Sequence, residues 1–170
     1  LLIGTTCSSG LVAASMANDM IKNLDCSPAL VTAASLILHP ASHIWHALAG
    51  GLSRKGRCLT FDSRADGFAR SEAVVAVVED AVLAGASTSL VEAKAVRSDG
   101  RSASLTAPNG VAQREMFEVA LAMTKHPADA FSCYEAHGTG TALGDPTEVG
   151  SLARALLQAR SRLVPPVALC

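Results

Sequence analysis

Cys7 has the sequence surroundings of an exposed nucleophile. It lies in the run TTCSSG at residues 5–10, between an apolar segment and a predicted helix. The small residues Thr5 and Ser9 stand two positions to either side, as a sharp strand–turn–helix bend requires. The amino end of a helix stabilises a thiolate, and the N–H of Cys7 can serve an oxyanion. A buried structural cysteine is the alternative, because free cysteines are often buried.

His137 ends a predicted strand and opens a glycine-rich loop. Three glycines follow within seven residues, and Thr139 and Thr141 alternate with them. Glycines let a ligand approach the backbone, and the threonine hydroxyls can donate hydrogen bonds to it. The spacing is not that of a dinucleotide-binding fingerprint. The loop therefore indicates a pocket with a histidine at its rim, and a purely structural histidine stays open as the alternative.

Other polar groups favour structural roles. Asp62 and Asp66 can be read as an acid–base pair, but carboxylates in such a loop more often brace it by accepting backbone N–H bonds. His39, His43 and His46 share one face of a predicted helix. No carboxylate or cysteine is interleaved with them, so we expect helix-surface or dimer-contact residues rather than a metal site.

The pattern of apolar residues and turn signals predicts alternating strands and helices, hence an α/β class. Asp145 is expected to cap the last helix, with Pro146 in its first turn. Two long loops, 52–70 and 97–110, are of a length usually reserved for function. The predicted strands are 1–6, 29–38, 73–78, 89–96, 131–136 and 164–169, and the predicted helical segments are 8–23, 41–49, 79–85, 111–124 and 146–159.

Composition narrows the class of protein. The 170 residues fit one domain or a large part of one, and the net charge of −1 argues against nucleic-acid binding. Hydrophobic residues make up 49% but aromatics only 4%, so the core must consist of Ala, Val and Leu. The apolar run at residues 29–38 is too short for a membrane span of about 20 residues. Five scattered cysteines without a C-x-x-C pair indicate a reducing compartment, the cytoplasm.

Four motifs, covering about residues 3–158, give the chain a resemblance to the β-ketoacyl synthase family. Their LTAPNG and HGTGT forms resemble the type I polyketide synthase branch more than discrete bacterial fatty-acid enzymes. The first motif consists of Thr5 and residues 7–9, and the second of residues 56–58, Phe61, Asp62, residues 65–68, Arg70 and Glu72. The third consists of residues 99–102, residues 105–110 and Gln113, and the fourth of residues 135–141, residues 144–146 and Glu148.

The resemblance implies a thiolase-like, layered αβαβα fold, present only in part, and usually a homodimer. Residues 1–170 would be a partial ketosynthase domain, with the end of the N-terminal half-fold and the start of the C-terminal half-fold. The implied activity is that of an acyltransferase performing decarboxylative Claisen condensation in polyketide or fatty-acid biosynthesis. Cys7 would hold the acyl chain as a thioester. His137 would assist decarboxylation of a malonyl unit and stabilise the enolate.

Substrates and partners also follow from the resemblance. Thr139 and Thr141 match threonines that contact the 4'-phosphopantetheine arm of an acyl carrier protein. Neither a metal nor a directly bound cofactor is expected. Neighbouring megasynthase domains are further expected partners. Glu135 and Glu148 are expected to be structural, because a carboxylate beside the enolate would oppose its charge. Four arginines in the loops can meet an acidic carrier protein or simply be solvated: Arg57, Arg64, Arg70 and Arg101.

The lack of an initial Met and of a basic leader suggests an internal fragment. The family's second active-site histidine would fall beyond Cys170, so we expect these residues by themselves to be inactive as a condensing enzyme. Two alternatives remain at this point. One is a thiolase-fold relative that does not condense, and the other is a catalytically incompetent scaffold piece of a megasynthase.

Overall fold

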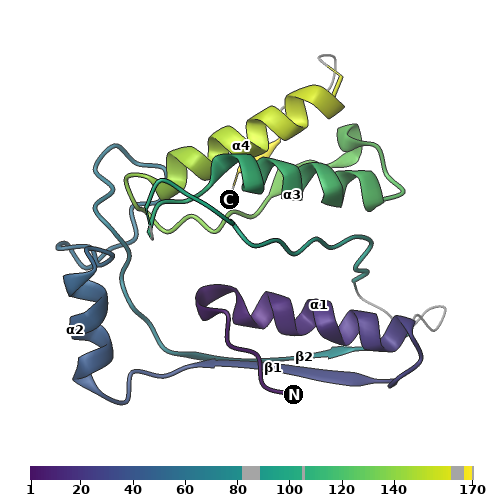
Figure 1. The fold of residues 1–170 in the computed structure, drawn as a ribbon, viewed down its shortest axis with the longest axis horizontal. Helices are drawn as coiled ribbons and strands as arrows, with labels where there is room; N and C mark the ends of the chain where they lie inside the picture. Colours follow the sequence, from purple (N-terminus) through teal and green to yellow (C-terminus); the bar gives the residue numbers. More distant parts are fainter. Residues whose placement is uncertain (82–88, 105, 162–166, 170) are drawn as a thin grey trace. The chain divides into compact units, whose positions relative to one another are not determined.

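A computed structural model describes residues 1–81, 89–104, 106–161 and 167–169 (Figure 1). The chain divides into two compact units. The first unit combines Leu1–Leu38 with Ser71–Val96, and the second combines His39–Arg70 with Arg97–Cys170. None of the helices in these described ranges has the length and apolarity needed to cross a bilayer.

In the first unit, one helix packs on a pair of strands. Helix α1 (Ser9–Lys22) lies along β1 (Ala29–Ser35) and β2 (Ala73–Glu79), which pair antiparallel with Val31 opposite Val77 (Figure 1). Ala17 and Ile21 of α1 and Val31 of β1 are buried between them. The predicted helix 8–23 and strands 29–38 and 73–78 are thus confirmed, with ends shifted by a few residues.

The outer surface of this strand pair is unusually apolar. Leu30, Val74 and Val78 are 69%, 69% and 66% exposed. An apolar run such as 29–38 predicts a buried strand, but within the described residues α1 covers one face of only two strands, so the outer face is exposed and that prediction is wrong. The predicted strand at 1–6 is also wrong, since it finds no strand partner in the described ranges and Leu1 is 95% exposed.

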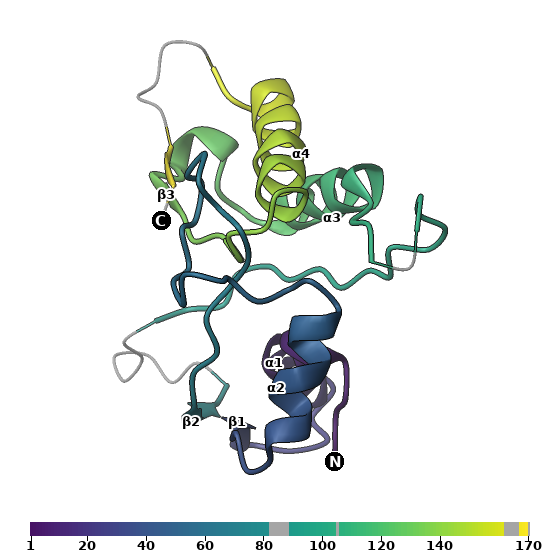
Figure 2. The same ribbon diagram turned by 90° about the vertical axis from the view of Figure 1, so that its left-hand side faces the viewer.

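In the second unit, helices α3 (Gly110–Met123) and α4 (Gly144–Ala159) pack side by side (Figures 1 and 2). Close packing starts at Gly110, where an added Cβ would lie 3.2 Å from the Ser151 hydroxyl oxygen. That hydroxyl donates to the Gly110 carbonyl at 3.0 Å. The short strands β3 (Cys133–Tyr134) and β4 (Ala168–Leu169) pair in parallel.

Two helices of the second unit begin at side-chain caps. Helix α2 (Pro40–Leu48) starts after His39, whose Nδ1 accepts a hydrogen bond from the Ala41 N–H at 3.1 Å. Helix α3 starts after Asn109, whose Oδ1 accepts from the Val111 and Ala112 N–H groups. The predicted helices 41–49 and 111–124 are confirmed, because these starting signals are local.

The remaining strand predictions are confirmed only in part or are wrong. Segment 131–136 contributes only Cys133–Tyr134, and 164–169 only Ala168–Leu169, since residues 164–166 lie outside the described ranges. Residues 89–96 form no strand in the described part of the chain, so that prediction is wrong. The helical turn predicted at 79–85 is wrong at Glu79, which belongs to β2, and residues 82–85 lie outside the described ranges.

Candidate functional site

Cys7 lies in a helical turn, Thr6–Ser8, directly before α1. Two serines hold the backbone on both sides of it. Ser8 Oγ donates to the Thr5 carbonyl at 2.9 Å, while Ser9 Oγ accepts from the Thr5 N–H at 2.9 Å and donates to the Thr6 carbonyl at 2.7 Å. Thr6 has a φ of +56°, a conformation that costs energy for a β-branched residue. The result is a constrained turn with an exposed thiol, unlike a buried structural cysteine.

His137 is exposed, and its backbone is held by the carboxylate of Glu148 from α4. Glu148 accepts from the N–H groups of His137 at 2.7 Å and Gly138 at 3.0 Å, and from the Tyr134 hydroxyl at 3.2 Å. Burial raises the pKa of Tyr134, and the charge of Glu148 and their hydrogen bond raise it further. The expectation that Glu148 is structural is confirmed, since it orients the residues around His137.

Thr139 and Thr141 lie together on the loop that follows His137. Their hydroxyl oxygens are 3.2 Å apart and partly buried. Thr141 Oγ1 also accepts from the Gly144 N–H at 3.1 Å, so the loop closes where α4 begins. Gly138 and Gly140, which alternate with these threonines, have φ values of +53° and +72°, which glycine adopts without steric cost.

Asp145 does not cap α4, which corrects the sequence-based expectation. Helix α4 begins two residues earlier than predicted, with Leu143 at its N-cap position. Asp145 is 5% exposed. Its carboxylate accepts from the Gly140 N–H at 2.9 Å and the Phe61 N–H at 2.8 Å. Both carboxylate oxygens are therefore used to join loop 52–70 to the loop of His137.

Loop 52–70 contacts the His137 loop at two further points. Thr60 Oγ1 donates to the Gly138 carbonyl at 2.5 Å, and the Gly67 N–H donates to the Gly140 carbonyl at 2.8 Å. Gly67 has a φ of +127°, and an added Cβ would lie 2.5 Å from the Gly51 carbonyl oxygen. The length of loop 52–70 predicted a functional role. In the structure, this loop holds the loop that follows His137 through these hydrogen bonds.

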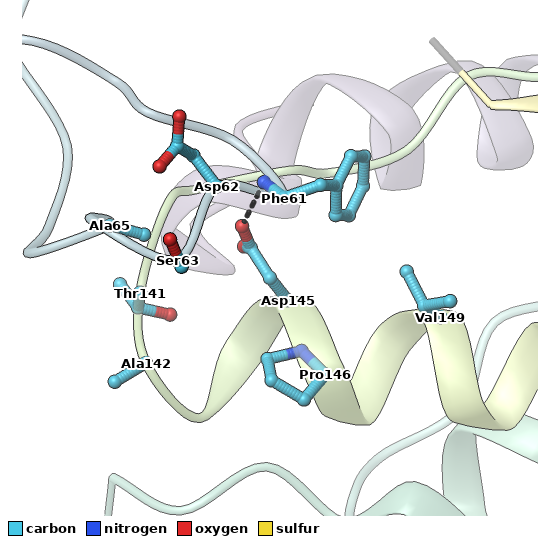
Figure 3. Close-up of a pocket in the computed structure, with 9 residues that line it drawn as sticks. All are labelled: Phe61, Asp62, Ser63, Ala65, Thr141, Ala142, Asp145, Pro146 and Val149. Carbon is cyan, nitrogen blue, oxygen red and sulfur yellow. Dashed lines mark hydrogen bonds between the residues drawn. The ribbon is translucent and has the colours of Figure 1, made fainter.

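A pocket of about 490 Å³ opens where these two loops meet the start of α4 (Figure 3). The Asp145 carboxylate points from the helix toward the Phe61 amide, and the Phe61 ring lies on the same side as Val149. Thr141, one of the predicted site residues, lies at its edge. The lining residues are Phe61, Asp62, Ser63, Ala65, Thr141, Ala142, Asp145, Pro146 and Val149.

Asp62 and Asp66 brace loop 52–70, as the sequence indicated. The Asp62 carboxylate accepts from the backbone N–H of Arg64 at 2.8 Å and from its guanidinium at 2.6 Å and 2.9 Å. These bonds with Arg64 hold the pKa of Asp62 well below its usual range. Asp66 accepts from the Ser53 hydroxyl at 2.6 Å. The two carboxylates thus serve different turns and do not form an acid–base pair.

The three histidines around α2 do not converge. His39 caps the helix, while His46 Nδ1–H donates to the Ser42 carbonyl at 2.6 Å. The His46 ring packs edge-on against Phe68, with 6.0 Å between ring centroids. Over the described ranges, no group of three or more His, Cys, Asp or Glu side chains is gathered closely enough to hold a metal ion.

Of the predicted site residues, the structure brings His137, Thr139 and Thr141 together in the second unit, whereas Cys7 lies in the first. Sequence reasoning missed the contributions of Thr60 and Asp145 to the His137 loop. Both positions lie in or beside motif residues, so the signal was present. No sequence pattern, however, indicated that the two loops bind each other.

Helices packed on strands, an exposed thiol at a helix start and a histidine on a braced glycine loop fit the thiolase-like fold that the resemblance implies. Solved structures agree. A ketosynthase from module 6 of the bacillaene synthase of Bacillus subtilis 168 matches with a TM-score of 0.88 at 31% identity, over 94% of this chain and 30% of that chain. An oxazolomycin ketosynthase domain of Streptomyces albus JA3453 matches with a TM-score of 0.89 at 31% identity, over 99% and 30% respectively.

The family follows from the sequence comparisons. Residues 1–79 match the N-terminal domain of β-ketoacyl synthases, and residues 88–168 match the C-terminal domain. The chain belongs to the β-ketoacyl synthase family.

Among curated relatives, the chain is 42% identical over 159 residues to a phenolphthiocerol/phthiocerol polyketide synthase of Mycobacterium tuberculosis. It is 38% identical over 167 residues to the erythronolide synthase EryA2 of Saccharopolyspora erythraea. These matches cover 91% and 95% of this chain but only 7% and 5% of those proteins.

Proposed function

We propose that the chain is part of a ketosynthase domain that performs decarboxylative Claisen condensation in polyketide biosynthesis. One observation carries the proposal. In a member of the β-ketoacyl synthase family, the two residue types that the reaction needs both occupy constrained, exposed positions: Cys7 at the start of α1 and His137 on its braced loop.

In the first step, the Cys7 thiolate attacks the carbonyl carbon of an acyl thioester. The acyl group moves to sulfur, and the thiol of the carrier leaves after taking up a proton. A thiolate suits this role because it is both a good nucleophile and a good leaving group, so the acyl chain can later be released again. The exposed turn at Thr6–Ser8 supports the step, because it presents the sulfur at the helix start.

In the second step, a malonyl thioester loses CO2, and the electron pair of the broken bond forms an enolate thioester. Its α-carbon attacks the acyl carbon on Cys7, the C–S bond to Cys7 breaks, and a β-ketoacyl thioester remains on the carrier. The imidazole N–H of His137 donates a hydrogen bond to the enolate oxygen as negative charge develops there. Its exposed position supports this role.

Substrates would arrive on the 4'-phosphopantetheine arm of an acyl carrier protein. The clustered hydroxyls of Thr139 and Thr141 support contact with such an arm, since it carries amide groups that need hydrogen-bond partners. We further propose that residues 1–170 hold the end of the N-terminal half-fold and the start of the C-terminal half-fold of one domain, acting as a homodimer beside other megasynthase domains.

The test uses the full-length protein with separate assays of acyl loading, malonyl decarboxylation and condensation. Iodoacetamide should label Cys7 before the other cysteines, and Cys7→Ala should abolish loading. Cys7→Gln should also stop loading but keep malonyl decarboxylation, which needs His137 and not the thiolate. Cys26→Ala, a cysteine elsewhere in the first unit, is the matched control and should load normally.

His137→Ala should spare loading and slow condensation by roughly 10²–10⁴-fold, the usual contribution of a positioned proton donor. Uniform labelling of all cysteines, or condensation that survives both Cys7→Ala and His137→Ala, would refute the proposal. If His137→Ala lost loading but extended a preloaded enzyme, the roles assigned to the two residues would be reversed.

A further inference from the structure

The imidazole of His137 depends on its backbone for its position. Over the described ranges, the side chain of His137 makes no hydrogen bond, whereas its N–H is bound by Glu148 at 2.7 Å. The next residue, Gly138, has the largest conformational freedom of any residue type and adopts a φ of +53°. Whatever restrains Gly138 therefore restrains the direction in which His137 points.

Gly138 is held at both of its polar groups, by two elements distant in the sequence. Its N–H donates to Glu148 at 3.0 Å, and its carbonyl accepts from Thr60 Oγ1 at 2.5 Å. Thr60 also packs against the glycine, because a Cβ added to Gly138 would lie 2.6 Å from Thr60 Cγ2. The hydroxyl and the methyl group of Thr60 thus contact one residue at two points.

Thr60 is itself held in place. The neighbouring Phe61 has a φ of +58°, and its N–H donates to the buried carboxylate of Asp145, which also binds the Gly140 N–H. The backbone that carries Thr60 is therefore fixed to the far end of the same glycine loop. A threonine so fixed can resist rotation about Gly138, which a surface hydroxyl on a free loop cannot do.

We propose that Thr60 is a positioning residue for His137, acting through the Gly138 carbonyl. The inference rests on the proposed function, because it assigns Thr60 to the step in which His137 acts. The proposal predicts different effects of Thr60 on the two half-reactions. Thr60 should matter for decarboxylation and condensation, where the imidazole must meet the enolate oxygen, but not for loading of Cys7.

The experiment compares Thr60→Val and Thr60→Ser in the full-length protein. Valine keeps the two-branched shape but cannot donate to Gly138, whereas serine keeps the donor and loses only the methyl group. We expect Thr60→Val to lower kcat for malonyl decarboxylation and condensation about 10-fold with little change in KM, a loss of about 1.4 kcal/mol of transition-state stabilisation. Loading of Cys7 should stay at the wild-type rate, and Thr60→Ser should restore most of the kcat.

Ser98→Ala, which removes an exposed hydroxyl elsewhere in the second unit, is the control and should change neither half-reaction. A Thr60→Val protein that condenses like wild type would overturn the inference while leaving the proposed function intact. Wild-type protein that neither loads nor condenses would instead refute the proposed function.

A loss of loading in Thr60→Val calls for a second variant, Thr60→Ala, which removes the donor and adds no bulk beside Gly138. If Thr60→Ala loads normally and condenses about 10-fold more slowly, the inference stands. If it loads and condenses normally, or if it too fails to load, the inference is wrong. The last case would mean that Thr60 stabilises the fold rather than the orientation of His137.

Discussion

Replacing Asp145 with asparagine tests how the two loops of the candidate site are joined. The carboxylate accepts two backbone N–H bonds, from Gly140 and Phe61, and is 5% exposed. An asparagine of the same shape accepts only one of them, because its amide nitrogen is a donor. One N–H therefore faces another donor in a nearly dry environment, and the loops lose one of the bonds that join them.

The expected effect can be worked out from the type of bond. A hydrogen bond to a charged group contributes roughly 1.5–3 kcal/mol. If local opening exposes the released amide, its hydrogen exchange should accelerate about 10–150-fold, since about 1.4 kcal/mol corresponds to a factor of ten. The measurement is hydrogen–deuterium exchange of the full-length protein, resolved at the amides of Gly140 and Phe61.

Asp129→Asn is a matched control. Its carboxylate accepts one backbone N–H, from Ser161 at 2.7 Å, at a different place in the second unit. It should leave the exchange of Gly140 and Phe61 unchanged. If Asp145→Asn also leaves both amides exchanging at the wild-type rate, the carboxylate does not join the loops and the reasoning about this site is refuted.

Three further predictions concern stability. Because the pKa of Tyr134 is raised by burial and by Glu148, stability should fall as pH rises above the ordinary tyrosine value of about 10, and denaturant unfolding of Tyr134→Phe should lack this fall. Gly67→Ala should destabilise the folded protein by more than about 2 kcal/mol, because the added Cβ meets backbone atoms and the residue has a positive φ. Gly150→Ala in α4 should instead stabilise the protein by about 0.5–1 kcal/mol in the same assay, because its added Cβ meets nothing within 4 Å. A polypeptide of these 170 residues should aggregate, since Leu30, Val74 and Val78 stay exposed. A monomer in gel filtration with one cooperative transition would contradict this.

Helices were predictable from the sequence because their signals are local. Asn109 and the His39-Pro40 pair mark helix starts within two or three residues of the groups they bind. Strands were harder, because a strand exists only with a partner. Segments 1–6 and 89–96 have suitable side chains but no strand partner among the described residues, and so do not become strands.

Asp145 shows a second limit of sequence reasoning. An aspartate followed by proline at a helix start is a strong capping signal. Here the same carboxylate serves the Gly140 and Phe61 N–H groups instead, and the Thr141 hydroxyl accepts from Gly144 at the helix start. Local preference was overridden because a buried carboxylate found two donors in loops that the sequence does not show to be neighbours.

The Cys7 turn and the His137 loop therefore differ in what specifies them. The hydrogen bonds of the Cys7 turn all fall within residues 5–9, so a short motif is sufficient to build it. The His137 loop instead depends on Thr60, 78 positions before Gly138, and on the bond from Phe61 to Asp145, which spans 84 positions. Substitutions in loop 52–70 should consequently alter the chemistry assigned to His137 and leave the acylation assigned to Cys7 unchanged.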